Sequence, residues 1–385
     1  MKKSMATFFM IMFVIGMDTF MVSPLLPTLA SMYHISADRA SWIVSSYALG
    51  YALFALIAGP LSDKINRKKV MFTGMICFGV MTILCAFAST FLIMIILRFL
   101  SGISAAFLTP QVWASIPIIS PKDKIVKNMG WATAGLALSQ MLGLPFGGVI
   151  ASFDWSAPFI FLGITSFVLS IFIFITIPSL PGAKDNLSFF SYFKQSYINV
   201  LQNKTLFIAL SAYLLFQLGN FTAFSFVGTW LTDSYSFNVK EVGISMFAIG
   251  LGNLTGSMMG SRIVKKIGMA RTLLSGLSGI AMMYIFITLV HSMMYVEVLF
   301  FVIFLLAGMI LPLMMATLQN IIPSSRGTVS SLTNATMNLG ITLGAVIGGT
   351  LYVHLSGFLS ISLFCAFLFI SSALVWKPLM KIRLF

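Results

Sequence analysis

The segment GPLSDKINRKKV, from Gly59 to Val70, carries five charged residues and lies between two long apolar stretches, approximately 41–62 and 70–88. A helix needs about 20 apolar residues to cross the roughly 30 Å hydrocarbon core of a bilayer, so each stretch is long enough to span a membrane. The charged segment then marks a turn of the chain at one membrane surface. A degraded copy of it, GSRIVKKIG from Gly260 to Gly268, stands in the second half of the sequence.

The composition agrees with a membrane protein. Hydrophobic residues make up 59% of the 385 residues and charged residues only 8%, whereas a soluble chain carries about 25% charged residues. The net charge of +14 would suggest a nucleic-acid partner in a soluble protein. Here the basic residues lie in short loops between apolar stretches, so we expect the lipid bilayer as partner and no nucleic acid.

The whole chain divides into twelve apolar stretches of spanning length, which predicts an all-α membrane protein with twelve transmembrane helices. The predicted spans are approximately 5–30, 41–62, 70–88, 91–115, 128–151, 157–177, 206–231, 241–261, 272–290, 294–316, 328–352 and 356–376. They form two pseudo-symmetric six-helix halves, an N-terminal bundle over 1–177 and a C-terminal bundle over 206–385, joined by a cytoplasmic linker over 178–205. Equal halves of this kind are a repeat architecture of secondary transporters, with the substrate site between the repeats.

The distribution of basic residues predicts the orientation. With the N-terminus in the cytoplasm, twenty of the 23 Lys and Arg residues lie on the cytoplasmic side. Only Arg39 and Lys240 lie on the opposite side, and Arg98 lies within a span. Because cytoplasmic loops carry the excess of Lys and Arg, both termini are predicted to be cytoplasmic.

The segment from Gly59 resembles the loop motif of the major facilitator superfamily, Gly-x-Leu-x-Asp-Arg-x-Gly-Arg-Lys/Arg. Lys64 and Asn66 depart from that pattern. Lysine keeps the charge, and asparagine tolerates the left-handed turn that we expect at this position. A motif of this length is unlike an ordinary positively charged loop, which is the plainer alternative.

The resemblance implies that this loop latches one state of the transport cycle. Glycine lets two helices approach, and the carboxylate of Asp63 can pair with basic residues or with a helix N-terminus. The residues that the resemblance places in this conformational latch are Gly59, Asp63, Arg67 and Lys68.

The segment from Arg98 to Pro110 resembles the fourth-helix motif of the same family, an arginine followed by a face of small residues. An arginine within a span costs about 2.5–3.5 kcal/mol on insertion scales, so it needs a partner. Asp18, in the first span, is the expected partner and can gain or lose a proton as its access alternates between the two sides. We therefore predict that Asp18 and Arg98 couple transport to protons; the alternative is a static pair that only holds the bundle together.

The fifth span resembles the antiporter motif of drug:proton antiporter-1 members, including bacterial sugar, arabinose, nucleoside and multidrug efflux proteins. The motif residues here are Gly135, Gly143, Pro145, Gly147 and Gly148. Glycines at helical spacing allow close packing, and proline bends a helix. Two further segments resemble the same relatives, Asp18 to Pro27 and Trp155 to Phe159, the second with Ser156 in place of an arginine. The resemblance favours export over uptake.

Polar residues within the spans are the candidates for a substrate cavity, because they are expensive in a membrane. Hydrogen bonds between helices are the alternative role for each of them. The predicted cavity residues are Asp18, Gln140, Gln217, Asn220, Phe221, Phe224, Asn253, Asn334 and Asn338.

The combined prediction is a monomeric, proton-coupled exporter of a drug, sugar, nucleoside or metallophore-like molecule in the bacterial cytoplasmic (inner) membrane. Its partners are the small-molecule substrate and protons, and the proton gradient replaces a cofactor. The alternatives are proton-coupled uptake and, more remotely, an intramembrane enzyme or sensor. No catalytic triad, phosphate loop or metal-ligand spacing is present in the sequence, so neither a catalytic nor a metal site is predicted.

Overall fold

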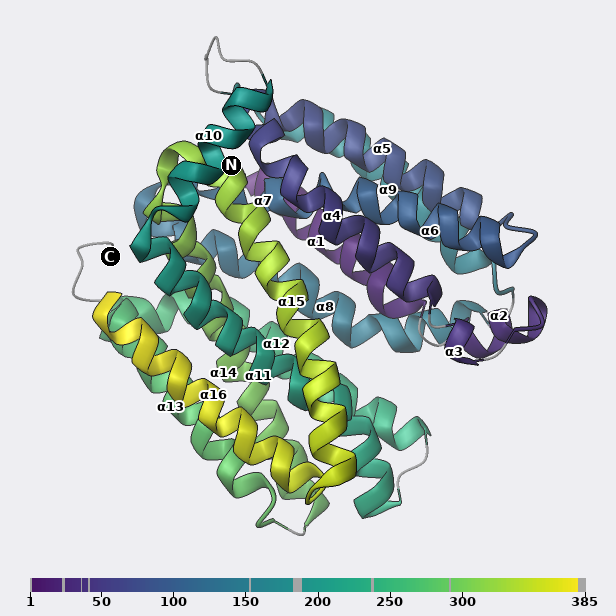
Figure 1. Ribbon diagram of the computed structural model, residues 1–385, viewed down its shortest axis with the longest axis vertical. Helices are drawn as coiled ribbons and strands as arrows, with labels where there is room; N and C mark the ends of the chain where they lie inside the picture. The colour runs from purple at the N-terminus through teal and green to yellow at the C-terminus, as the bar shows by residue number, and fades with distance from the viewer. Residues whose placement is uncertain are drawn as a thin grey trace. The chain divides into compact units, whose positions relative to one another are not determined.

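The computed structural model describes residues 2–22, 25–35, 37–40, 42–151, 154–182, 189–236, 239–290 and 292–379. Within these ranges the regular structure is helical and contains no strand (Figure 1). Ten helical segments are long and apolar enough to cross a membrane. They are α1 (Lys2–Met21), α4 (Trp42–Lys64), α5 (Arg67–Cys85), α6 (Phe91–Ala106) with α7 (Thr109–Ile119), α9 (Ala157–Thr176), α11 (Lys204–Tyr235), α13 (Met269–Ile287), α14 (Met293–Ile321), α15 (Arg326–His354) and α16 (Phe358–Leu379).

Two further long helices, α8 (Ile125–Ala151) and α12 (Val239–Ile267), take the places of the predicted fifth and eighth spans. The predicted twelve-span helical fold is therefore confirmed. Most helices extend a few residues beyond the predicted ends, because polar residues such as Lys204 and Lys266 continue the helix past the apolar stretch.

Two predicted spans are interrupted at prolines. The first was expected to run over 5–30, but α1 ends at Met21 and a short helix α2 (Leu26–Met32) follows, with a proline in its first turn. The fourth divides into α6 and α7, and α7 also has a proline in its first turn. Proline lacks an N–H group and disfavours helical geometry in the residue before it, so a helix tends to end there and a new one to begin.

The predicted linker contains a helix of its own. Helix α10 covers Phe189–Leu201, and the Tyr197 hydroxyl donates a hydrogen bond of 2.6 Å to the Leu56 carbonyl of α4. The short helix α3 (Ala37–Ala40) lies between α2 and α4.

The chain forms two compact units. The first contains residues 1–122, 138–200 and 324–334, and the second contains 123–137, 201–323 and 335–385. Each unit thus includes a short segment from the other half of the sequence. The domain boundaries at 177 and 206 stay a prediction.

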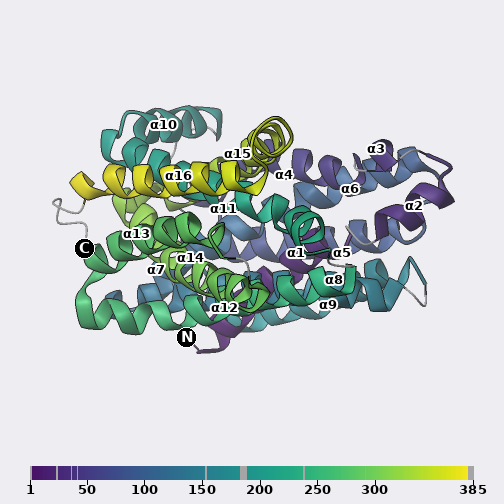
Figure 2. The same ribbon diagram turned by 90° about the horizontal axis from the view of Figure 1, so that it is seen from below.

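The same order of helix pairing recurs in both units. In the first unit α4 packs on α6, α5 on α9 and α1 on α9. In the second unit the corresponding pairs are α12 with α14, α13 with α16 and α11 with α16, and Figure 2 shows α12 beside α14. Since α1, α4, α5, α6 and α9 precede α11, α12, α13, α14 and α16 in the same order, the pairing supports an internal repeat.

Glycines bring the corresponding pairs together. A Cβ atom at Gly50 of α4 would overlap with the Phe99 carbonyl of α6, and one at Gly102 of α6 would overlap with the Tyr47 carbonyl. In the second unit Gly252 of α12 and Gly308 of α14 make equivalent close approaches to their partner helix. Small residues at such crossings let helix backbones touch, which is how helices associate in membranes.

Candidate functional site

The Asp18 and Arg98 side chains meet inside the first unit. Asp18 lies on α1 and Arg98 on α6, and only 0% and 1% of them is exposed. The Nη1 atom of Arg98 donates to both Asp18 carboxylate oxygens, at 2.8 Å each. The predicted pair therefore forms, and each charge neutralises the other within the span.

Arg98 also has contacts that do not depend on Asp18. Its Nε atom donates to the Ile43 carbonyl at 3.4 Å, and its guanidinium lies 4.5 Å from the ring centroid of Tyr47. Ile43 and Tyr47 are one turn apart on α4, so one face of α4 contacts the arginine. The close approach at Gly102 positions this face, because it brings the Tyr47 backbone against α6.

Tyr47 was missed by the sequence reasoning. Its side chain is buried, only 6% of it being exposed. A tyrosine in a span is too common to single out by type. The available signal was the i, i+4 spacing of Ile43 and Tyr47 in the second span.

The second cluster forms around Asp63, at the end of α4. Its carboxylate accepts hydrogen bonds from the Gly327 amide at 2.8 Å and from the Thr328 amide and hydroxyl at 2.9 and 3.0 Å. Arg67 Nη2 donates to the same carboxylate. The N-terminus of α15 carries a partial positive charge and free N–H groups, so it is a natural site for this anion.

Glycines make the Asp63 cluster possible. A Cβ atom at Gly59 would overlap with the Ser331 hydroxyl, and one at Gly327 would lie 2.7 Å from Asp63 Oδ1. Tyr51 of α4 also donates a hydrogen bond of 2.9 Å to Asn334 Oδ1 of α15. The structure thus brings Gly59, Asp63 and Arg67 together with the first turns of α15.

The other two residues singled out in this loop have different roles. The ammonium of Lys68 lies over the Phe174 ring, 4.9 Å from its centroid. Asn66 was expected in a left-handed turn, and this expectation is wrong because its φ is −63°. Its side chain caps α5 by accepting from the Lys68 amide at 3.0 Å, and it donates to Ser179 Oγ at 2.7 Å.

In the degraded copy of the motif, the following helix begins without a side-chain cap. Helix α13 begins after Gly268, whose φ is +86°. Only glycine adopts this conformation without strain, and it offers no side-chain cap. The left-handed turn is therefore present in the second half and absent in the first.

The fifth-span motif lies on α8, which contributes to both units. Gly143 is buried, and a Cβ atom there would lie 2.6 Å from the Phe20 Cβ atom of α1. Gly135 is buried within the segment that belongs to the second unit. Pro145, Gly147 and Gly148 continue the helix, but their side-chain environment lies outside the described residues.

Asp154 lies before the start of α9 and bonds to Ser156. Its carboxylate accepts hydrogen bonds of 2.9 Å from the amide and the hydroxyl of Ser156. These bonds hold the pKa of the Asp154 carboxyl below its ordinary value. Ser156, where the family pattern has an arginine, therefore starts α9 as a local hydrogen-bond donor.

The polar candidates on α11 differ in their bonding. Gln217 is buried and donates a hydrogen bond of 2.9 Å to the Tyr213 hydroxyl. Asn220 is partly buried, and its Oδ1 atom has no hydrogen-bond partner among the described residues. Phe221 is partly buried, as is Phe224, whose ring meets Phe304 edge-on at 6.2 Å. Asn220 is therefore the α11 residue with an unused polar atom.

The remaining cavity candidates are spread over several helices. Asn334 is buried and also donates to the Ser330 carbonyl at 2.9 Å, so with Tyr51 it joins α15 to α4. Asn338 lies one turn further along α15, in the second unit. Asn253 of α12 is partly buried against Gly308, and Gln140 of α8 is partly buried in the first unit.

Within the described part of the chain no group of three or more His, Cys, Asp or Glu side chains could hold a metal ion. Paired helices, a buried ion pair and a helix-capping carboxylate remain as the chemically distinctive features. The sequence profile of the Major Facilitator Superfamily matches residues 8–345.

The chain belongs to the major facilitator superfamily. It is 46% identical, over 97% of its length and 95% of the relative's, to the "Uncharacterized MFS-type transporter YceJ" of Bacillus subtilis. It is 24% identical to the quinolone resistance protein NorA of Staphylococcus aureus, over 92% of each chain. It is 25% identical to multidrug resistance protein 2 of Bacillus subtilis, over 91% of each chain.

Comparison with solved structures also identifies the major facilitator fold. The human organic anion transporter MFSD10 matches with a TM-score of 0.84 at 17% identity, over 97% of this chain and 99% of that one. The protein is therefore a multi-pass membrane transporter of the major facilitator type.

The structure adds residues to the two major facilitator motifs that sequence reasoning did not include. Arg98 is joined by Tyr47, and Asp63 by Gly327 and Thr328. The sequence offered a signal for the second group, because a glycine stands at the start of the eleventh span, directly after a proline-containing loop. Gln111 of α7 was also missed; it is fully buried and donates to the Ala58 carbonyl at 3.3 Å.

Proposed function

We propose that this major facilitator transporter exports a small organic molecule across the bacterial cytoplasmic membrane in exchange for protons. The observation that carries the proposal is the buried ion pair between Asp18 and Arg98 within the membrane spans. Removing one member of a buried pair leaves an uncompensated charge, which costs about 3–5 kcal/mol. A change in the charge state of Asp18 would therefore alter the energy of the pair, which is what coupling to protons requires.

The surroundings of Arg98 support a dynamic pair over a static one. Both Asp18 oxygens are bonded to a single guanidinium nitrogen, while Nε and the guanidinium face have separate partners in Ile43 and Tyr47. When a proton binds Asp18, the arginine keeps these two contacts. Protonation of Asp18 therefore weakens the ion pair, while Arg98 keeps its contacts with Ile43 and Tyr47.

In the proposed cycle a proton reaches Asp18 from outside and neutralises its carboxylate. The weakened pair favours the state that opens to the cytoplasm, where the proton leaves and substrate binds. Re-formation of the pair and substrate binding then favour the outward state, and the substrate is released outside. The Asp63 cluster acts as a latch that lengthens the lifetime of one of these states.

Export is preferred to uptake for two reasons. The small-residue pattern of the fifth span resembles that of antiporters, and Gly143 makes a close approach to α1. In addition, two relatives at 24% and 25% identity are a quinolone resistance protein and a multidrug resistance protein. Drugs, sugars, nucleosides and metallophores all fall within the proposed substrate class.

The test compares small molecules inside cells and in the medium between a deletion strain and strains restored with wild type, Asp18→Asn or Asp123→Asn. Asp123 is exposed in a loop, so its variant controls for the loss of one carboxylate. A compound retained by the deletion and Asp18→Asn strains, and released by the other two, would establish export and implicate Asp18. A compound depleted inside the deletion strain would instead establish uptake.

A second measurement isolates the proton. In proteoliposomes, an imposed pH gradient should drive movement of that compound by wild type and Asp123→Asn but not by Asp18→Asn. Exchange of the compound without a gradient should survive in Asp18→Asn. If Asp18→Asn still responded to the gradient, the coupling role of Asp18 would be excluded.

A further inference from the structure

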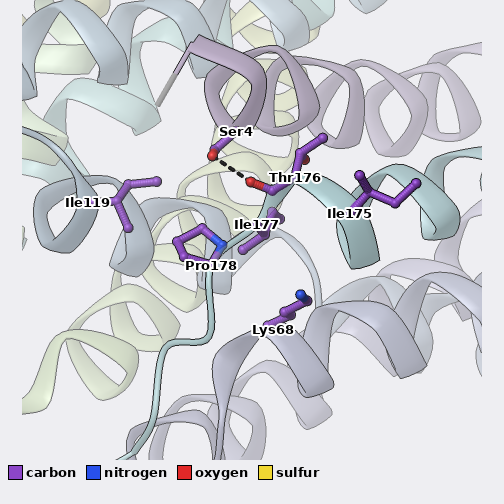
Figure 3. A pocket seen from close by; sticks show the side chains of 7 residues that line it. All are labelled: Ser4, Lys68, Ile119, Ile175, Thr176, Ile177 and Pro178. Carbon is purple, nitrogen blue, oxygen red and sulfur yellow. Dashed lines mark hydrogen bonds between the residues drawn. The ribbon is translucent and has the colours of Figure 1, made fainter.

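A cavity of about 420 Å³ lies at one end of the first unit, where four helix ends meet (Figure 3). The N-termini of α1 and α5 and the C-termini of α7 and α9 form it. Its lining residues are Ser4, Lys68, Ile119, Ile175, Thr176, Ile177 and Pro178. The basic loops predict that this end faces the cytoplasm.

Lys68 is the single charged residue in this lining. Its ammonium contacts the Phe174 ring, and the ion pairs of the described residues, Asp18–Arg98 and Asp63–Arg67, do not include it. A partly buried ammonium held in this way carries an unbalanced charge next to a cavity. The cavity is therefore suited to an anion.

The hydroxyl groups of the lining are already engaged. Ser4 Oγ donates to the Thr176 carbonyl at 2.8 Å, and Thr176 Oγ1 donates to the Phe172 carbonyl at 2.8 Å. The first bond ties α1 to α9, and the second lies within α9; both hydroxyl groups belong to the wall of the cavity. They leave Lys68 as the principal group for binding the anion.

The outer face of α9 continues from the cavity as an apolar stripe. The exposed apolar side chains at helical spacing along it are Ile164, Val168, Ile171, Phe172 and Ile175. Ile175 is both part of the cavity lining and 71% exposed, so the cavity opens directly onto a surface that must face lipid. A ligand that fits both parts has an anionic head and a hydrocarbon tail.

We propose that this cavity binds the phosphate of an anionic phospholipid from the cytoplasmic leaflet, with the acyl chains lying along α9. Lysine near a membrane surface contributes about 1 kcal/mol of attraction to anionic lipid, and basic pockets between spans are suited to lipid headgroups. Exposed lysines at the same end, Lys2, Lys3 and Lys69, add to the local positive potential. The proposal does not depend on the direction of transport or on protons.

The test is native mass spectrometry of the full-length protein in detergent, titrated with phosphatidylglycerol or with phosphatidylcholine of the same chain length. Wild type should retain one phosphatidylglycerol molecule in preference to phosphatidylcholine. Lys68→Gln should bind that molecule about fivefold more weakly, in line with the loss of one lysine. Lys69→Gln is the matched control, because Lys69 is exposed and does not line the cavity.

Equal losses in Lys68→Gln and Lys69→Gln would mean that lipid responds to net charge alone, and would overturn the site. Lys68→Arg keeps the charge and should retain the lipid, which covers the case in which Lys68→Gln fails to fold. The last experiment adds inorganic phosphate at millimolar concentration to wild type that holds phosphatidylglycerol. If it displaced phosphatidylglycerol from wild type completely, the cavity would be a site for free phosphate and the lipid proposal would fail.

Discussion

The Asp63 carboxylate accepts two hydrogen bonds from Thr328, a residue 265 positions later in the sequence, through the Thr328 amide at 2.9 Å and its hydroxyl at 3.0 Å. One side chain at the end of α4 thus neutralises the start of α15 and pairs with Arg67 at the same time. Both roles need a negative charge, because the partners are a helix N-terminus and a guanidinium.

Asp63→Asn keeps the size of the side chain and removes that charge. We expect the amides of Gly327 and Thr328 to exchange hydrogen on the order of tenfold faster, because a charge-assisted bond contributes about 1.5–3 kcal/mol and a neutral one less. Hydrogen exchange with mass spectrometry over the first turns of α15 measures this directly. Turnover should slow by a similar factor while substrate binding is largely kept.

Asp123→Asn is the control for this variant, since Asp123 is exposed and lies in a loop of the same predicted side. Unchanged exchange at Gly327 and Thr328 in Asp63→Asn would show that the carboxylate does not hold α15. Faster exchange with unchanged turnover would show that the carboxylate holds α15 but does not act as a latch.

Asn66 provides a second prediction, on stability. Its Oδ1 atom caps α5 by accepting from the Lys68 amide and also accepts from the Leu180 amide, and its Nδ2 atom donates to Ser179. Asn66→Ala removes all three bonds and should lower the free energy of unfolding by about 1 kcal/mol or more. Asn66→Gly, the family residue, should cost less than Asn66→Ala because glycine also serves as a cap, but it too loses the bonds to Ser179 and Leu180.

Thermal unfolding of the purified variants in detergent measures their relative stabilities. Asn66→Asp keeps an acceptor for the Lys68 and Leu180 amides and loses the Nδ2 donor, so it separates the donated bond from the two accepted ones. A melting temperature for Asn66→Ala equal to that of wild type would contradict a stabilising cap.

The twelve spans could be predicted because each needs one local property, a long apolar stretch. The breaks after Met21 and Ala106 lie beside prolines within otherwise continuous apolar segments, so hydropathy did not predict them. Asp18 and Arg98 could be paired from the sequence because few charged residues lie within spans. The sequence signals at Tyr47 and Thr328 do not identify their partners, since their roles arise only when α4 meets α6 and α15.

Two of the predicted cavity residues also show what the sequence alone does not predict. Asn334 and Asn338 are one turn apart on α15, but Asn334 belongs to the first unit, where it bonds Tyr51, and Asn338 belongs to the second. Spacing along a helix says which residues share a face but not which neighbour covers each turn. That information comes from packing between segments far apart in the chain.

The helix crossing at Gly102 gives a third prediction. A Cβ atom at Gly102 would overlap with the Tyr47 carbonyl, so Gly102→Ala should force α4 and α6 apart and lower the melting temperature. Overpacking of this kind costs about 1–3 kcal/mol. It should also disturb the contact between Tyr47 and Arg98.

Gly349→Ala of α15 is the matched control, because the nearest atom to its Cβ would be Phe226 Cζ at 3.6 Å, an ordinary contact. Alanine is the better helix former, so this variant should be neutral or stabilised by up to about 1 kcal/mol. Equal melting temperatures for the two variants would mean that the α4–α6 crossing adapts to an added methyl group.

Asn220 gives the last prediction, which separates substrate binding from stability. Its Oδ1 atom is buried without a hydrogen-bond partner among the described residues, and such an atom costs about 1–3 kcal/mol of folding stability. Asn220→Leu should therefore leave the melting temperature unchanged or raise it. If Oδ1 accepts a hydrogen bond from the bound substrate, the same variant should raise KM about tenfold for the compound found in the export assay.

Gln217→Leu on the same helix should behave in the opposite way. It removes the bond to Tyr213 and leaves a buried hydroxyl without that partner, so the melting temperature should fall. Melting curves and transport kinetics of both variants, measured side by side, decide between the roles. A lower melting temperature and an unchanged KM in Asn220→Leu would assign Asn220 to helix packing and remove it from the substrate cavity.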